Sequence, residues 1–115
     1  MAEIAATVAE GEARTFIVQW VLGAGDTGKP ISYPGAADRT VQIFGSFGGA
    51  TVAMQGTLEL SPTTWLPVTD AQGNAISATS NTLEAITELV RWIRPSVTGG
   101  TGTAVTILLL MRTTI

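Results

Sequence analysis

The chain has 115 residues, no cysteine, no histidine and a single lysine, and its formal net charge is −3. These counts exclude disulfides, thiol or imidazole catalysts, and zinc sites built from thiolate or imidazole ligands. A chain of this length forms one domain that buries roughly two thirds of its unfolded surface in a single core.

The charges are unevenly distributed along the chain. Glu3, Glu10 and Glu12 precede Arg14, which leaves six acidic and six basic residues in a net neutral remainder. Only 13% of all residues are charged, whereas 45% are hydrophobic. A neutral, weakly charged surface promotes association, so we expect a protein that works within an assembly. Nucleic acid is not expected as a partner, because no basic footprint is present.

No segment predicts membrane insertion or export. The longest apolar run, residues 107–111, is far shorter than a bilayer span. The N-terminus lacks the basic start and apolar centre of a signal peptide. We therefore expect synthesis in the cytoplasm and no membrane partner.

Residues 1–13 are small and acidic, and they predict an extended N-terminal arm outside the folded body. From Arg14 onward, apolar and polar residues alternate and threonine becomes frequent, which predicts strands. The first strand is expected at residues 15–22, with Phe16, Val18, Trp20 and Leu22 on one face. A long loop rich in glycine and proline follows, over residues 23–37.

Residues 40–47 and 50–60 form two alternating runs separated by Gly48 and Gly49. Two glycines at this position favour a tight turn, so the pattern predicts a β-hairpin. In the second run, four apolar side chains are predicted to point inward: Val52, Met54, Leu58 and Leu60.

Shorter runs between turns predict the remaining strands, at residues 65–69, 75–79, 83–89, 90–97 and 104–112. Seven to eight short strands at this spacing predict an all-β chain in which residues 14–115 form a single antiparallel β-sandwich, jelly-roll-like in type. The last strand is apolar on both faces. Leu108 and Leu110 are therefore either covered within the fold or lie at a subunit contact.

Residues 23–30 contain a G-x-G-x-x-G pattern and part of a G-x-x-x-x-G-K pattern. Either would bind phosphate only if a helix began here. Pro30 stands where the second motif needs serine or threonine, and Pro34 with Gly35 would end any helix within a turn. We interpret the segment as a loop that joins two strands.

No set of residues predicts a catalytic centre. Glu84 and Glu88 would lie about 13 Å apart on a strand, beyond the carboxylate separation of glycosidases. Asp26, Asp38 and Asp70 do not follow the spacing of a calcium loop. We expect no catalytic, cofactor-binding or metal-binding residue and no enzymatic activity.

The tryptophans leave two roles open. Trp20 shares a face with Phe16 and is expected in the core. Trp65 follows a polar turn, and Trp92 lies between Arg91 and Arg94, where a guanidinium can stack on the indole. Both belong either to the core and subunit contacts or to a sugar-stacking platform.

Several short motifs lie between residues 41 and 110: VQIFGSFGGATV at 41–52, QG at 55–56, Trp65, TD at 69–70, QGNA at 72–75, VRWIRP at 90–95 and GG at 99–100. Together they resemble the head decoration, or cement, proteins of tailed bacteriophages. Trp65 and the motif at 91–94 also resemble the discoidin-like, galactose-binding jelly roll. The resemblance implies a β-sandwich on a capsid lattice, often as a trimer, and it carries over no catalytic residue.

These observations predict a structural virion protein on the outer surface of the capsid, bound to the major capsid protein as a homotrimer. The alternatives are a carbohydrate-binding module on a virion surface and another head or tail component. Candidate capsid or subunit contacts lie in the arm, around two tryptophans and on the last strand: Glu3, Ile4, Val8, Glu10, Glu12, Trp65, Arg91, Trp92, Arg94, Leu108 and Leu110.

Overall fold

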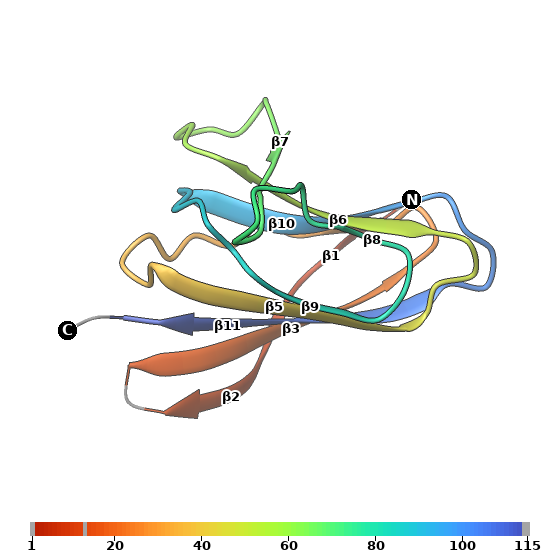
Figure 1. Cartoon of the computed structure of the whole chain (residues 1–115), viewed down its shortest axis with the longest axis horizontal. Coiled ribbons are helices and arrows are strands. Elements are labelled where there is room, and N and C mark those ends of the chain that lie inside the picture. The colour runs from red at the N-terminus through yellow and green to blue at the C-terminus, as the bar shows by residue number, and fades with distance from the viewer. Residues whose placement is uncertain (1, 13, 114–115) are drawn as a thin grey trace.

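A computed structural model describes residues 2–12 and 14–113, except for the side chains of residues 9–12. Its regular elements are eleven β-strands, arranged as two sheets that pack face to face (Figure 1). This confirms the prediction of an all-β, jelly-roll-like sandwich, although the described residues form eleven strands rather than seven to eight, and one pair of them is parallel.

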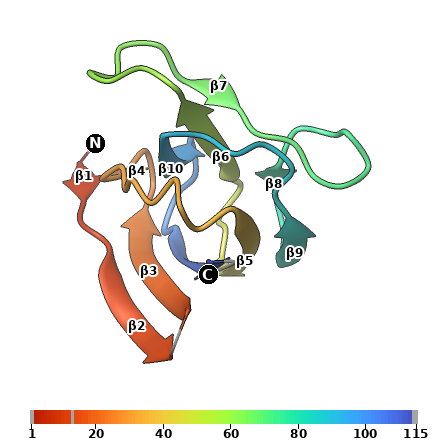
Figure 2. The same cartoon turned by 90° about the vertical axis from the view of Figure 1, so that its left-hand side faces the viewer.

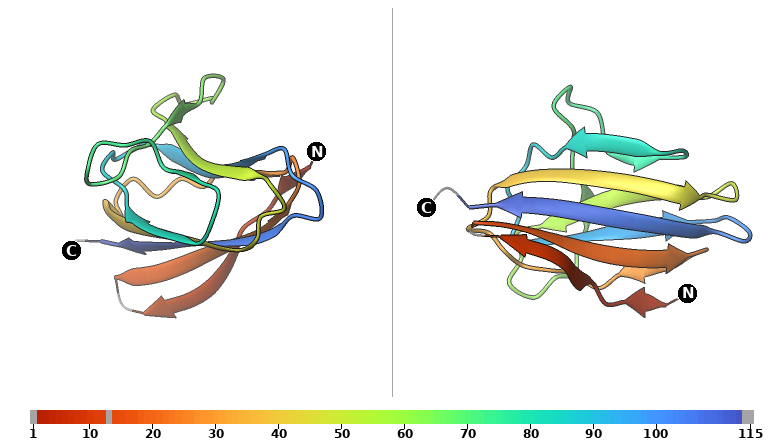
Figure 3. Two further views of the ribbon diagram at one scale, coloured as in Figure 1. Left: turned by 45° about the vertical axis from the view of Figure 1, so that its right-hand side comes forward. Right: turned by 90° about the horizontal axis from the view of Figure 1, so that it is seen from below.

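The upper sheet in Figure 1, sheet A, has the strand order β1-β4-β10-β6-β7, and β8 also pairs with β6. Its strands are β1 (Glu3–Ile4), β4 (Thr27–Gly28), β6 (Thr51–Thr57), β7 (Leu66–Pro67), β8 (Ser77–Ala78) and β10 (Trp92–Thr98). Sheet B has the order β2-β3-β11-β5-β9 (Figure 3, right). It contains β2 (Thr7–Glu12), β3 (Thr15–Gly23), β5 (Asp38–Ser46), β9 (Thr82–Ala85) and β11 (Ala104–Arg112).

The core lies between the sheets, because alternate residues of the long strands point inward. The largest fully buried side chains include Trp20, Ile43, Met54, Ile107 and Leu109. The indole Nε1 of Trp20 donates a hydrogen bond of 3.1 Å to the carbonyl of Lys29. The predicted core position of Trp20 is therefore correct, and its polar atom is satisfied inside the sandwich.

Strand β11 occupies the centre of sheet B and coincides with the predicted last strand, residues 104–112. One of its faces is completely buried, with Ile107 and Leu109 at 0% exposure. The other face points out of the sandwich, where Leu108 is half-buried and Leu110 is 36% exposed. Cover within the fold therefore explains the face of Ile107 and Leu109 only. It does not explain the face of Leu108 and Leu110, for which a subunit contact stays a prediction.

The predicted hairpin at residues 40–60 is wrong. The tight turn exists, because Gly48 and Gly49 both have positive φ and Ala50 N–H donates to the carbonyl of Phe47. The flanking strands nevertheless separate, since β5 pairs with β11 in sheet B and β6 pairs with β10 in sheet A. Thr103 Oγ1 donates to the same Phe47 carbonyl, so the turn is a braced corner between the sheets.

The N-terminal segment is extended as predicted, but it is not an arm outside the body. β1 pairs in parallel with β4 of sheet A, and β2 pairs antiparallel with β3 of sheet B (Figure 2). Strand pairing satisfies backbone groups that a free arm would leave to water. Residues 3–12 therefore belong to the sandwich, and the predicted division between an arm at 1–13 and a body at 14–115 is incorrect in this respect.

Candidate functional site

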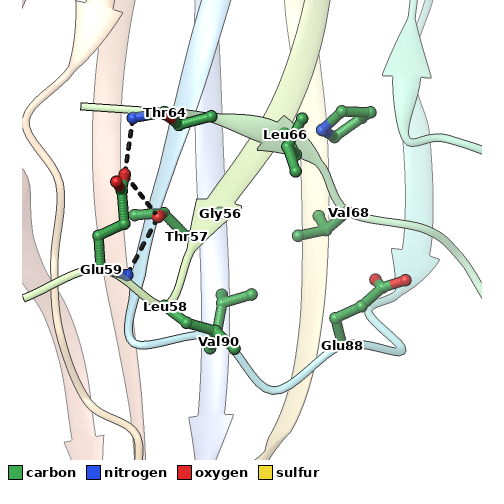
Figure 4. A pocket seen from close by; sticks show the side chains of 10 residues that line it. Gly56, Thr57, Leu58, Glu59, Thr64, Leu66, Val68, Glu88 and Val90 are labelled. Atoms are coloured by element: carbon green, nitrogen blue, oxygen red, sulfur yellow. Dashed lines mark hydrogen bonds between the residues drawn. The ribbon is translucent and has the colours of Figure 1, made fainter. Parts of the chain in front are cut away.

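A groove of about 490 Å³ lies at the end of β6 (Figure 4). We call it the β7 groove. Its lining residues come from β6, the loop after it, β7 and the segment before β10: Gly56, Thr57, Leu58, Glu59, Thr64, Leu66, Pro67, Val68, Glu88 and Val90. The loop and β7 project from the sandwich, which opens the groove to solvent (Figures 1 and 4).

The floor of the groove depends on a glycine. Val68 and Val90 form the buried part, with exposures of 2% and 9%. A Cβ on Gly56 would lie only 2.7 Å from Cγ2 of Val90, closer than real contacts allow. Glycine at this position therefore lets the segment before β10 pack directly on the β6 backbone.

The walls of the groove carry two unusually exposed leucines. Leu58 is 69% exposed and Leu66 is 64% exposed. The prediction that Leu58 and Leu60 point inward is wrong, because β6 ends at Thr57 and the chain turns outward. Leu58 also lines an adjoining hollow of about 380 Å³ with Pro34, Leu89, Val90 and Arg91, so the apolar surface continues beyond the groove.

Glu59 holds the turn that creates this shape. Its carboxylate accepts hydrogen bonds from the backbone N–H groups of Thr63 and Thr64, and from the hydroxyls of Thr63 and Thr57. The backbone hydrogen bonds from Thr63 and Thr64 lower the pKa of Glu59 below its ordinary value. The carboxylate is therefore ionised at neutral pH.

Glu88 plays a similar part on the other side of the groove. Its carboxylate accepts hydrogen bonds from the hydroxyl of Thr69 at 2.5 Å and from the backbone N–H of Thr69 at 2.6 Å. These contacts, the hydroxyl first, lower the pKa of Glu88. Both carboxylates are bonded to uncharged donors, so their negative charge is not neutralised by these contacts.

A second cluster lies on the outer face of sheet A and joins residues that the sequence singled out separately. The guanidinium carbon of Arg94 lies 4.1 Å from the centroid of the Trp65 ring, and Arg94 Nε donates to Gln55 Oε1 at 3.0 Å. Partial burial lowers the pKa of Arg94, and the nearby carboxylate of Glu3 raises it. Trp65, Arg94 and Glu3 are thus brought together.

Trp92 lies two residues before Arg94 on β10 and is half-buried. Its indole Nε1 is buried and has no hydrogen-bond partner within the described part of the chain. The sequence predicted that a guanidinium stacks on Trp92, but the stacked pair in the described residues is Arg94 with Trp65. Arg91 is exposed and donates from Nε to the carbonyl of Leu58 at 3.1 Å, beside the β7 groove.

The outer face of sheet B carries a shallow hollow of about 300 Å³ around the other predicted contacts. Its lining is apolar or uncharged: Ile17, Thr40, Gln42, Leu83, Leu108 and Leu110. In the register of the sheet, Leu108 and Leu110 of β11 lie between Gln42 and Thr40 of β5 on one side and β3 on the other. Sheet B lies on the opposite side of the sandwich from β7, which lines the β7 groove (Figure 1).

The remaining predicted contacts are dispersed. Ile4 is half-buried and packs against the core, so little of its side chain is available to contact another protein. Val8 is 66% exposed on β2. The side chains of Glu10 and Glu12 lie outside the described residues.

The groove itself was missed by sequence reasoning. Leu58 and Leu60 continue the alternation of Val52 and Met54, and that periodicity conceals the end of the strand. The polar turn at residues 61–64 was the available signal, since it follows directly on these leucines. Glu59 bonds to threonines two to five residues away, within the turn itself. Glu88 has no local motif, because its partner Thr69 lies 19 residues away and is brought to it by the tertiary fold.

The described residues contain no group of three or more histidine, cysteine, aspartate or glutamate side chains that would hold a metal ion. No helix begins at residues 23–30, where the glycine-rich pattern lies. Asp26 accepts a hydrogen bond from the N–H of Gly23 at 2.8 Å, and Thr27 and Gly28 form β4. The segment joins β3 to the rest of the chain without a helix, as interpreted, but it is not all loop, because β4 lies within it. Over residues 2–12 and 14–113, no helix is long and apolar enough to cross a lipid bilayer.

The two packed sheets and their strand order define the chain as a jelly-roll-like β-sandwich of the kind found in cupins. The SPBc2 prophage-derived protein YomS is similar to it in structure, with a TM-score of 0.60, 15% sequence identity, and coverage of 84% of this chain and 93% of that protein. No family model and no curated protein sequence matches the chain.

Two further solved structures share the fold. An uncharacterized protein with a double-stranded β-helix domain from Klebsiella pneumoniae has a TM-score of 0.57 and 11% identity, and covers 96% of this chain and 73% of its own. An RmlC-like cupin from Desulfovibrio desulfuricans has a TM-score of 0.56 and 9% identity, with 96% and 82% covered. At identities this low, the structural similarity shows the fold alone. The function of this chain has to be inferred from its own surfaces.

Proposed function

We propose that the chain is a non-enzymatic structural protein of a bacteriophage particle, a decoration protein that binds the lattice of the major capsid protein on the outer surface of the head. The observation that carries the proposal is a pair of apolar surfaces, one lined by β7 and the other on the outer face of sheet B. A protein with two such surfaces is suited to contact copies of itself with one and the lattice with the other.

Two other observations support this role. The solved structure of a prophage-derived protein is similar to the chain over most of its length. The motifs at residues 41–100 resemble head decoration proteins, and the neutral body from Arg14 onward favours association over free diffusion. Synthesis in the host cytoplasm and a homotrimeric state belong to the same proposal, with the outer face of sheet B as the subunit contact.

The test compares particles of the phage or prophage that encodes the chain, with the gene intact and with it deleted. Quantitative mass spectrometry of purified heads should give hundreds of copies per particle, and purified protein should rebind to the deficient heads. About a dozen copies would instead indicate a ring-shaped connector or tail component, because symmetry sets the copy number. Absence from the particles would overturn the proposal.

Carbohydrate binding is the competing proposal, and it depends on Trp65 and Trp92. Arg94 occupies one face of the Trp65 ring, which leaves a single face for stacking on a sugar. The indole Nε1 of Trp92 has no hydrogen-bond partner among the described residues, but it is buried. A sugar hydroxyl could accept from it only if the side chains that cover it moved away. Quenching of tryptophan fluorescence by galactose or other simple sugars would favour this function over capsid binding.

A further inference from the structure

We propose that the β7 groove binds an extended protein segment in which apolar side chains are flanked by lysine or arginine. The proposal rests on the proposed function for the source of that segment, a subunit of the capsid lattice. Its chemistry is argued from the groove alone.

The shape of the groove suits one or two apolar side chains. Val68 and Val90 give it a buried apolar floor, and the exposed side chains of Leu58 and Leu66 stand at its sides (Figure 4). Leaving two leucines about two thirds exposed beside a preformed hollow is unfavourable in water. An apolar side chain inserted between them would remove both from solvent, which is how anchor residues act in protein interfaces.

The charge of the groove selects the flanking residues. Glu59 and Glu88 lie on opposite sides of the apolar floor (Figure 4), and both are held ionised by threonine donors. Among the described residues that line the groove, none is a cation. Arg91 lines the adjoining hollow on the far side of Leu58, and its Nε is engaged by the Leu58 carbonyl. A segment with basic residues on both sides of its apolar centre complements this pattern.

A second copy of the chain is a poorer occupant. Two of its segments place basic residues beside apolar ones, residues 91–94 and 107–112. The first is held by the pairing of β10 with β6, and the second lies at the centre of sheet B between β3 and β5. Arg112 is already paired with Asp38. The matching segment therefore belongs to a different protein.

The first experiment titrates ¹⁵N-labelled full-length protein with two synthetic peptides, Ac-Lys-Leu-Val-Leu-Lys-NH₂ and its charge-reversed counterpart Ac-Glu-Leu-Val-Leu-Glu-NH₂. With the basic peptide, we expect amide chemical-shift changes centred on Gly56, Thr57, Val68 and Val90. The acidic peptide should bind with a Kd about tenfold higher. Binding of the basic peptide should also weaken as sodium chloride is raised. Shifts located elsewhere, no shifts, or equal affinity for both peptides would overturn the proposal.

Variants separate the apolar and electrostatic contributions. Leu58→Ser with Leu66→Ser should weaken peptide binding about tenfold or more, because both walls are lost. Glu88→Gln, which removes the charge and keeps the shape, should bring the two peptides closer in affinity. Val21→Ser is the matched control, since Val21 is 54% exposed on β3 and away from the groove. An equal effect of the Val21 substitution would contradict the assignment.

The same variants then distinguish this inference from the proposed function. Wild-type protein that rebinds deficient heads establishes the function. If the double leucine variant remains folded by circular dichroism and rebinds with unchanged affinity, the groove is not the contact and the function stands. If wild-type protein does not bind heads but binds the basic peptide in the groove, the inference about chemistry survives and the function fails.

Discussion

Gly28 lies where β4 packs tightly against β10 and the core tryptophan, and Gly28→Ala tests that packing directly. A Cβ at this position would lie 2.5 Å from Cδ of Pro95, 2.6 Å from its Cγ and 2.9 Å from Cδ1 of Trp20. Ordinary contacts between carbon atoms begin near about 3.5 Å. The proline ring is rigid, and the indole is held by its hydrogen bond to Lys29, so neither yields easily.

Overpacking of this kind destabilises by about 1–3 kcal/mol. Two rigid neighbours place Gly28→Ala in the upper half of this range. The reduced freedom of the unfolded chain offsets about 0.4–1 kcal/mol. We therefore expect a net loss of about 2 kcal/mol in the free energy of unfolding and a fall of about 8 °C in Tm.

Urea denaturation followed by tryptophan fluorescence, with calorimetry for Tm, measures this loss. Gly35→Ala is the control, because no heavy atom lies within 4 Å of its added Cβ. We expect it to change the stability by less than about 0.5 kcal/mol, or to raise it slightly. A Gly28→Ala protein as stable as the wild type, or an equal loss in Gly35→Ala, would refute the reasoning.

Further predictions follow from the two faces of β11, the groove and the N-terminus. Leu109→Ala should reduce the free energy of unfolding by about 3 kcal/mol, and Leu110→Ala by less than about 1 kcal/mol; equal losses in urea denaturation would contradict the assigned faces. Leu110→Asp should leave a folded protein that sediments as a monomer, and an intact oligomer would exclude this face as the subunit contact. The hydrogen bonds from Thr69 lower the folded-state pKa of Glu88 below 4.5, so their stabilisation is present above about pH 4.5 and is lost as the pH falls through the folded value. Glu88→Gln should therefore flatten the acid limb of a plot of Tm against pH, and an unchanged slope would argue against these contacts. Deleting residues 2–12 removes β1 and β2, and should lower the free energy of unfolding by about 2 kcal/mol or more. An unchanged Tm would instead support an arm that lies outside the folded body.

The long strands could be predicted from the sequence because apolar and polar residues alternate along them, and this alternation follows from one face of each strand being buried. The last predicted strand, residues 104–112, matches β11 at both ends, and its fully buried side chains all lie on one of its two apolar faces. The hairpin prediction failed for a different reason. Two glycines determine a local turn, but the partner of each strand is decided by β10 and β11, which lie at least 35 residues further along the chain.

Two-residue strands such as β1, β4 and β7 have no periodicity to detect. They exist because neighbouring long strands offer backbone partners, which is a tertiary effect. In the candidate site, too, the residue types could be read from the sequence, whereas their contacts depend on the tertiary structure. Trp65 and Arg94 could be singled out as an aromatic and a cation, but their contact depends on β7 and β10 both flanking β6.

The charged residues give the strongest physical reason to place this chain in an assembly. Arg39 is only 3% exposed, donates to the carbonyls of Ala36 and Tyr33, and has a buried Nη1 without a partner among the described residues. Its burial lowers its pKa and removes a cation from the surface. Asp70 is buried as well, and accepts hydrogen bonds from the backbone of a turn.

Arg94 is likewise half-buried and donates to Gln55 within the fold. The surface of the body is therefore less charged than the composition indicates, whereas its leucines at positions 58, 60 and 66 are at least 64% exposed. Water solvates such a surface poorly, and self-association without a defined partner would lead to aggregation. A partner that covers these leucines would resolve the conflict, and the β7 groove is the surface that we propose for this contact.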